Sequence, residues 1–102
     1  MTKSKFIKYL IGLGYYKLNE RANTDIYYIH TDTNIENYNQ IDLRIDFQKN
    51  RYRILLWDGD YDFKIKESKE IKTYIQLINI IEKYKIRNHV MWRKTHIKQV
   101  LK

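Results

Sequence analysis

The chain has 102 residues, a formal net charge of +8 and no cysteine. A chain of this length has room for one core, so we expect a single domain over residues 1–102. The absence of cysteine excludes disulfides, thiolate catalysis and cysteine-based zinc sites. No apolar stretch approaches the roughly 20 residues that a membrane span needs, and we therefore expect a cytoplasmic protein with no membrane contact.

Charge is distributed unevenly along the chain. Residues 1–21 and 63–102 carry an excess of Lys and Arg, whereas residues 22–62 carry an excess of Asp and Glu. The sequence is also rich in Lys, Ile, Asn and Tyr, with 3 Gly and no Pro. This skew is typical of AT-rich genomes and points to a low-GC bacterium or to its phages and plasmids.

The first predicted element is a helix that starts at a Thr2 or Ser4 cap and ends near Gly14. Its apolar face is predicted from the spacing i, i+1, i+4 and i+5 of Phe6, Ile7, Leu10 and Ile11. Two short strands rich in Tyr and Ile are expected over residues 15–18 and 25–30, joined by a polar turn. A polar loop over residues 31–40 follows them.

Residues 41–66 alternate apolar and charged side chains in three runs, separated by Lys-Asn at 49–50 and Asp-Gly at 58–59. Two-residue turns at these places predict a three-stranded meander in which Ile54 lies opposite both Ile45 and Phe63. The face away from the core is then predicted to carry Asp42, Arg44, Asp46, Arg53, Leu55, Trp57, Asp60, Asp62, Lys64 and Lys66. Because Asp46 would oppose Arg53, we expect this face to be nearly neutral and not the main polyanion site.

After Lys66 the apolar period becomes helical, with Ser68 as the expected N-cap. The apolar stripe of this helix is predicted to contain Ile71, Ile75, Ile78 and Ile81. Loss of phase at Arg87 and Asn88 predicts a bend, and a last helix from about His89 to Leu101 follows. Its narrow apolar stripe is Val90, Ile97 and Leu101. We expect this basic helix, within residues 89–102, to be semi-independent of the rest.

The predicted class is α+β: a helix, an antiparallel meander of three to five strands, and C-terminal helices that cover one sheet face. This order resembles the double-stranded-RNA-binding fold. The opening "KFIKYLIGLGYYKLNERANTDIYYIH" is also similar to that of HicA-type toxins, which are small mRNA interferases with that fold. The toxins carry Gly-Ser-His at the entry to the second strand, where this chain reads "ANTDIYY" and places His30 at the strand's far end. The resemblance implies a ribonuclease in which His30 is the residue to test.

Other chemical motifs in the sequence are incomplete. The segment "DGDYDF" begins like a calcium loop, but Phe63 and Lys69 occupy the positions that require Gly and Glu. His30, His89 and His96 lie too far apart in sequence to form a local metal site. The sequence also lacks a Gly-rich phosphate loop and a nucleophile with an evident base. We therefore expect no catalytic residue, no metal and no cofactor.

The segment "KYKIRNHVMWRKTHIKQVLK", residues 83–102, contains seven Lys or Arg and no carboxylate. Without acidic partners one helical turn away, these cations gain most from an anionic partner, and Trp92 between them suits stacking against nucleic acid. The predicted binding residues are Lys85, Arg87, Trp92, Arg93, Lys94 and Lys98, with Lys3, Lys5 and Lys8 as a secondary set. The alternative is a solvated helix in which Trp92 anchors the helix to the core.

Two functions are compatible with these patterns. The first is a small non-enzymatic basic protein that binds nucleic acid or a nucleic-acid-binding host protein. In size, composition and charge the chain resembles phage and mobile-element proteins of this type, including anti-CRISPR inhibitors of host nucleases. The second function is a HicA-like mRNA interferase toxin. The patterns leave the oligomeric state open.

Overall fold

The computed structural model describes residues 1–18, 25–31, 33–35, 37–59 and 62–100, and for residues 95–100 it describes the backbone alone. In chain order the elements are α1 (Lys3–Gly12), β1 (Tyr16–Lys17), β2 (Ile26–Ile29), β3 (Gln40–Asp46), β4 (Arg51–Trp57), β5 (Phe63–Glu70), α2 (Tyr74–Tyr84) and α3 (His89–Val100). The turn predicted over residues 19–24 lies outside the described residues.

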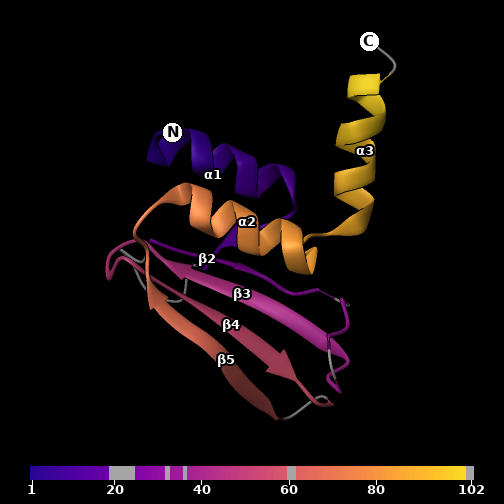
Figure 1. Cartoon of the computed structure of the whole chain (residues 1–102). Coiled ribbons are helices and arrows are strands. Elements are labelled where there is room, and N and C mark those ends of the chain that lie inside the picture. Colours follow the sequence, from indigo (N-terminus) through magenta and orange to yellow (C-terminus); the bar gives the residue numbers. More distant parts are fainter. Residues whose placement is uncertain (19–24, 32, 36, 60–61, 101–102) are drawn as a thin grey trace.

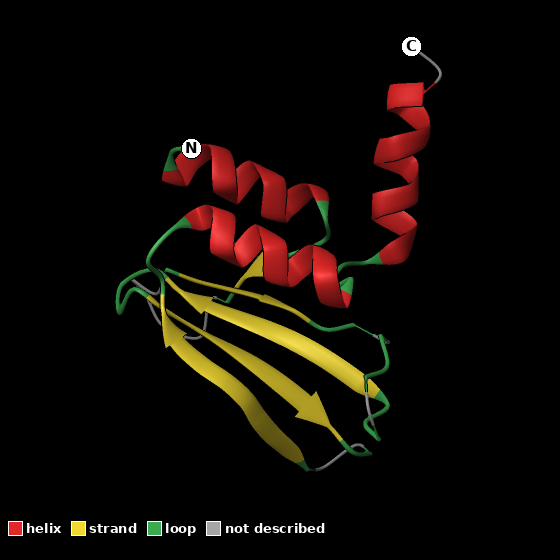
Figure 2. Cartoon of the chain, viewed as in Figure 1, coloured by secondary structure: helices red, strands yellow, loops and turns green. Residues whose placement is uncertain are grey.

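The five strands form one antiparallel sheet in the order β1-β2-β3-β4-β5. Helices α1 and α2 lie on one face of this sheet, whereas α3 extends away from it (Figure 1). In the described part of the chain no helix covers the other face, which we call the open face (Figure 2). The predicted α+β class, with helices over one side of a meander, is confirmed.

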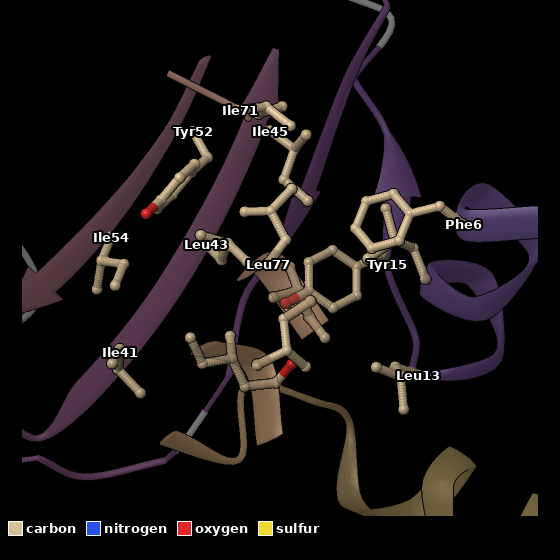
Figure 3. Close-up of a cluster of buried hydrophobic side chains, with 14 of the residues drawn as sticks. Phe6, Leu13, Tyr15, Ile41, Leu43, Ile45, Tyr52, Ile54, Ile71 and Leu77 are labelled. Atoms are coloured by element: carbon tan, nitrogen blue, oxygen red, sulfur yellow. Dashed lines mark hydrogen bonds between the residues drawn. The ribbon is translucent and has the colours of Figure 1, made fainter. Parts of the chain in front are cut away.

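The core lies between the sheet and the first two helices. The strands contribute the fully buried side chains of Ile29, Ile41, Leu43, Ile45, Tyr52 and Ile54. The helices contribute those of Phe6, Leu10, Leu77 and Ile81. Leu77 and Tyr15 are part of this layer (Figure 3), and the Tyr15 hydroxyl donates to the Ile86 carbonyl at 2.9 Å. Each such large apolar side chain contributes about 1.5–3 kcal/mol on burial, so this layer holds the helices on the sheet.

Helix α1 begins as the sequence predicts, because the Thr2 hydroxyl accepts from the Lys5 N–H at 3.3 Å. Phe6 and Leu10 face the core, but Ile11 is 50% exposed, so its predicted place in the apolar stripe is wrong. The buried face instead follows i, i+4 and i+7, ending at Leu13, which is the spacing of a single helical face. The Tyr9 hydroxyl donates to Glu82 at 2.7 Å and joins α1 to α2.

The register between β3 and β4 differs from the predicted one by two residues. Ile54 pairs with Leu43, and Asp46 pairs with Arg51 rather than with Arg53. The favoured two-residue turns have positive φ at the first central residue or at both. Among residues 49 and 50 only Asn50, the second, has it (φ 53°), and the turn instead spans residues 47–50. Because the shift is even, each side chain keeps its predicted face.

The register between β4 and β5 is shifted by an odd number of residues, and this moves side chains to the other face. The connection runs over residues 58–62, so Trp57 pairs with Phe63 and Leu55 pairs with Ile65. Phe63 and Ile65, predicted to be core residues, therefore lie on the open face, 51% and 48% exposed.

Lys64 was predicted to lie on the open face, but it pairs with the buried Leu56 and therefore lies on the helix-covered side. The register breaks between Ile54 and Leu55, where a bulge places Lys66 beside the ring of Tyr84, with its Nζ 5.3 Å from the ring centroid. The predicted open-face positions of Lys64 and Lys66 are therefore wrong. Asp60 lies outside the described residues.

The second helix begins later than the sequence predicts. Ser68 is part of β5, and the N-cap of α2 is Thr73, whose hydroxyl accepts from the Gln76 N–H at 3.2 Å. The charged run at 63–70 forms a strand because β4 supplies ladder partners as far as the pair between Arg51 and Glu70. Backbone pairing thus overrides the helical pattern of this segment.

Ile81→Ala and Ile75→Ala form a matched pair on α2. Ile81 is fully buried and Ile75 is 65% exposed, so the predicted burial of Ile75 is wrong. Both changes alter helix propensity equally. We expect Ile81→Ala to lower the free energy of unfolding by about 2–5 kcal/mol and Ile75→Ala to lower it by less than about 0.5 kcal/mol, measured by urea denaturation. Equal losses at the two positions would contradict this orientation of α2.

Candidate nucleic-acid interface

The basic helix α3 begins at a bend, as the sequence predicts. Lys85 ends α2 in the left-handed conformation (φ 53°), and its N–H donates to the Ile81 carbonyl. The Asn88 N–H then donates to the Leu13 carbonyl at 2.7 Å, while the Asn88 side chain accepts from the Met91 N–H at 3.1 Å. Asn88 therefore docks α3 on the end of α1 and caps it at the same time.

Gly14 makes this close approach possible. Its φ is +100°, and a Cβ at this position would lie 2.5 Å from the Asn88 Cβ. A residue with a side chain would be strained and would collide with the start of α3. The sequence indicated that Gly14 ends α1, but it gave no sign that α3 packs there.

Arg87, predicted to bind a partner, lies in the interior at the base of α3, where it is 8% exposed. Its guanidinium lies 3.7 Å from the centroid of the Trp92 ring, and its Nη1 lies 3.5 Å from the Glu82 carboxylate. Trp92 is partly buried and packs against the core. Trp92 therefore anchors α3 to the core, which is the alternative role that the sequence left open. Arg87 lies against the Trp92 ring.

The remaining predicted cations of this segment lie on the surface. Lys85, Arg93 and Lys94 are exposed, and the side chain of Lys98 lies outside the described residues. Val90, expected in the apolar stripe of the helix, is 61% exposed. Because the sequence has no Asp or Glu after Glu82, no carboxylate of α3 itself offsets these charges.

The three lysines of the secondary set on α1 are all exposed, but they differ in their partners. Lys3 forms an ion pair with Asp25 and lies 5.0 Å from the centroid of the Phe47 ring. Lys3 is at the end of α1 that points away from α3 (Figure 1). Lys3 therefore does not belong to the basic surface that the α3 cations form.

A polar cluster around Asp42 was missed by sequence reasoning. The Asp42 side chain is fully buried under the open face, although it was predicted to be solvated there. It accepts from the Thr31 N–H at 2.9 Å and from the Gln40 amide at 3.0 and 3.1 Å. It also accepts from the Tyr28 hydroxyl, and it lies 3.2 Å from the exposed His30 ring. A buried carboxylate needs such partners, and only the strand register brings them together.

Tyr28 stays protonated in this cluster. Its burial, followed by its hydrogen bond to Asp42 and the charge of that carboxylate, raises the pKa of Tyr28 well above its ordinary value. Beside the cluster, a groove of about 320 Å³ lies between the ends of β2 and β3 and the start of α3. His30 and Gln40 line one side of this groove, and Asn88 and His89 line the other.

Comparison of the chain with protein-family models, with curated proteins and with solved structures finds no match. Over the described residues, no helix is long and apolar enough to cross a membrane. The same residues contain no group of three His, Asp or Glu side chains arranged to hold a metal ion.

The contact between Gly14 and Asn88 can be tested against a second glycine. We expect Gly14→Ala to lower the free energy of unfolding by more than about 1 kcal/mol, because of its positive φ and the collision with Asn88. Gly12→Ala should instead stabilise by about 0.5–1 kcal/mol, since Gly12 ends α1 with no atom within 4 Å of a Cβ. Thermal or urea unfolding measures both, and a neutral Gly14→Ala variant would contradict the docking of α3.

Proposed function

We propose that the chain is a non-enzymatic protein that binds nucleic acid through the basic surface of α3. The observation that carries this proposal is the exposure of Lys85, Arg93 and Lys94 around a helix whose base is fixed by Asn88 and Trp92. A projecting cationic helix without compensating carboxylates attracts phosphates and releases their counterions on binding.

The composition of α3 argues against a merely solvated helix. An exposed helix is normally supported by pairs of opposite charge one turn apart, and α3 has no acidic residue with which to form them. Its cations therefore gain most from an external anion. A nucleic-acid-binding host protein with an acidic surface, as in an anti-CRISPR-like inhibitor, is the alternative partner.

The dependence of affinity on salt tests this proposal. We expect Arg93→Gln/Lys94→Gln to weaken nucleic-acid binding and to reduce the slope of log affinity against log salt by about 0.7 per cation on single strands, or 0.9 on duplex. The control is Lys69→Gln/Lys72→Gln, which removes the same net charge from two exposed positions that precede α2 in the chain; Lys69 pairs there with Glu67 at 3.0 Å. Fluorescence anisotropy with labelled oligonucleotides measures both variants.

Equal behaviour of the two double variants would contradict a nucleic-acid interface on α3. Capture of a host protein that survives nuclease treatment and is lost with Arg93→Gln/Lys94→Gln would assign α3 to the protein partner instead.

Ribonuclease activity is a second candidate function, and the contact between His30 and Asp42 favours it. The buried carboxylate lies 3.2 Å from Nδ1 of an exposed imidazole, and a carboxylate on Nδ1 is the arrangement that orients a histidine as a general base. The Gln40 amide nitrogen lies 2.7 Å from Nδ1 and 3.1 Å from Nε2, so it would have to turn away for Nε2 to accept a proton. In such a reaction His30 would take the proton of an RNA 2′-hydroxyl. The 2′-oxygen would then bond to phosphorus, and the 5′-oxygen would leave with a proton from water.

His30→Ala tests this second candidate. We expect it to reduce cleavage of labelled RNA by at least about 100-fold, and to leave folding intact because the His30 side chain is 63% exposed. His89→Ala is the control, since the His89 ring lies 3.3 Å from the Thr33 hydroxyl and has no contact with Asp42 among the described residues. RNA that remains intact with wild-type protein, or that is cut equally by His30→Ala, would exclude this activity.

A further inference from the structure

The strand register assembles one row of side chains across the open face. Tyr16 pairs with Tyr28, Tyr28 with Arg44, and Arg44 with Arg53. Paired residues on neighbouring strands project to the same side of a sheet. Two aromatic rings and two guanidinium groups, which are far apart in the sequence, therefore lie side by side.

The arginine end of this row forms a small pocket of about 50 Å³. Its lining consists of Arg44, Asp46, Lys49, Arg51 and Arg53. Four cations thus surround one carboxylate, and the Asp46 side chain already accepts from the Lys49 N–H at 3.1 Å. Within the described residues, no ion pair joins any of the three arginines to a carboxylate.

The observed register changes one of the charge pairs expected on this face. Arg44, not Asp46, lies opposite Arg53, whereas Arg51 lies opposite Asp46 on one side and Glu70 on the other. Like charges directly opposite one another are destabilising in a sheet. An anion in the pocket would remove this repulsion, and the planar guanidinium groups suit the oxygens of a phosphate.

The aromatic end of the row, Tyr16 and Tyr28, indicates which kind of molecule would carry the phosphate. The Tyr16 and Tyr28 rings are 5.7 Å apart in an edge-to-face arrangement, and Tyr16 is 48% exposed. Exposed rings next to phosphate-binding cations suit single strands, whose unpaired bases are free to stack. In a duplex the base faces are covered, so the rings would have nothing to stack against.

We propose that the pocket between Arg44 and Arg53 holds a backbone phosphate of a single-stranded nucleic acid, and that the exposed Tyr16 ring stacks against an adjoining base while Tyr28 supports that ring edge-on. This proposal rests on the proposed nucleic-acid-binding function but places a second contact on the open face, separate from α3. The pocket admits one phosphate, and its volume is too small for a base.

The test measures binding of a fluorescein-labelled single-stranded oligonucleotide to the full-length protein by anisotropy over a range of salt. We expect Arg44→Gln/Arg53→Gln to weaken binding by on the order of tenfold and to lower the salt slope by about 0.7, the value for one phosphate. Tyr16→Ala should weaken binding by on the order of tenfold without changing the slope. The control for the loss of two charges is again Lys69→Gln/Lys72→Gln.

Folding of the arginine variant is checked by its thermal midpoint, which should be equal to or above that of the wild type at low salt because the repulsion is removed. Binding by Arg44→Gln/Arg53→Gln that equals the Lys69→Gln/Lys72→Gln control would overturn the inference. So would an equal loss on duplex and single-stranded probes together with a neutral Tyr16→Ala variant.

The two proposals fail in different ways. Loss of binding with Arg93→Gln/Lys94→Gln but not with Arg44→Gln/Arg53→Gln would leave α3 as the interface and exclude the pocket. The reverse result would support the pocket and exclude α3.

Discussion

The pairing of β4 with its two neighbours decides which side of the protein each functional residue reaches. Side chains alternate along a strand, so a shift by one residue exchanges the core face for the open face. The connection at residues 58–62 sets this pairing for β5 and brings Phe63 and Ile65 to the open face. The turn at residues 47–50 sets the pairing of β4 with β3 and brings Arg44 opposite Arg53. The β4 and β5 side chains of the core and the arginine pocket both depend on these two connections.

Burial of Asp42 is a consequence of the pairing between β2 and β3. Tyr28 lies on β2 and His30 directly follows that strand, and both turn toward the carboxylate that β3 presents. The backbone N–H of Thr31 completes the site. These donors satisfy the hydrogen-bonding capacity of the buried carboxylate within the sheet. The exposed imidazole of His30 is thereby given a fixed orientation at the edge of the groove.

Alternation and composition were enough to predict the α+β class, the face of each β3 and β4 side chain and the bend at Arg87 and Asn88. They were not enough to predict loop lengths. Asp58 and Gly59 are a good hairpin pair by local chemistry, but local chemistry does not exclude a longer connection. The charged run at 63–70 has weak strand character of its own and becomes a strand through pairing with β4. Trp92 illustrates the same limit, since Arg93 and Lys94 follow it in the sequence and indicate a binding surface, whereas in space it packs against the core and the buried Arg87.

The groove that contains His30 joins the two proposed contact surfaces. Its walls are the ends of β2 and β3, which border the open face, and the residues Asn88 and His89 at the start of α3. A strand that ran from the arginine pocket over the open face to the exposed Arg93 and Lys94 along this groove would avoid the face on which α1 and α2 lie (Figure 2). The ring of His30 would then lie next to the backbone of that strand. A single strand on this route would therefore contact both surfaces and also lie next to His30. The binding function and the ribonuclease function differ in whether the imidazole that Asp42 orients reacts with that strand.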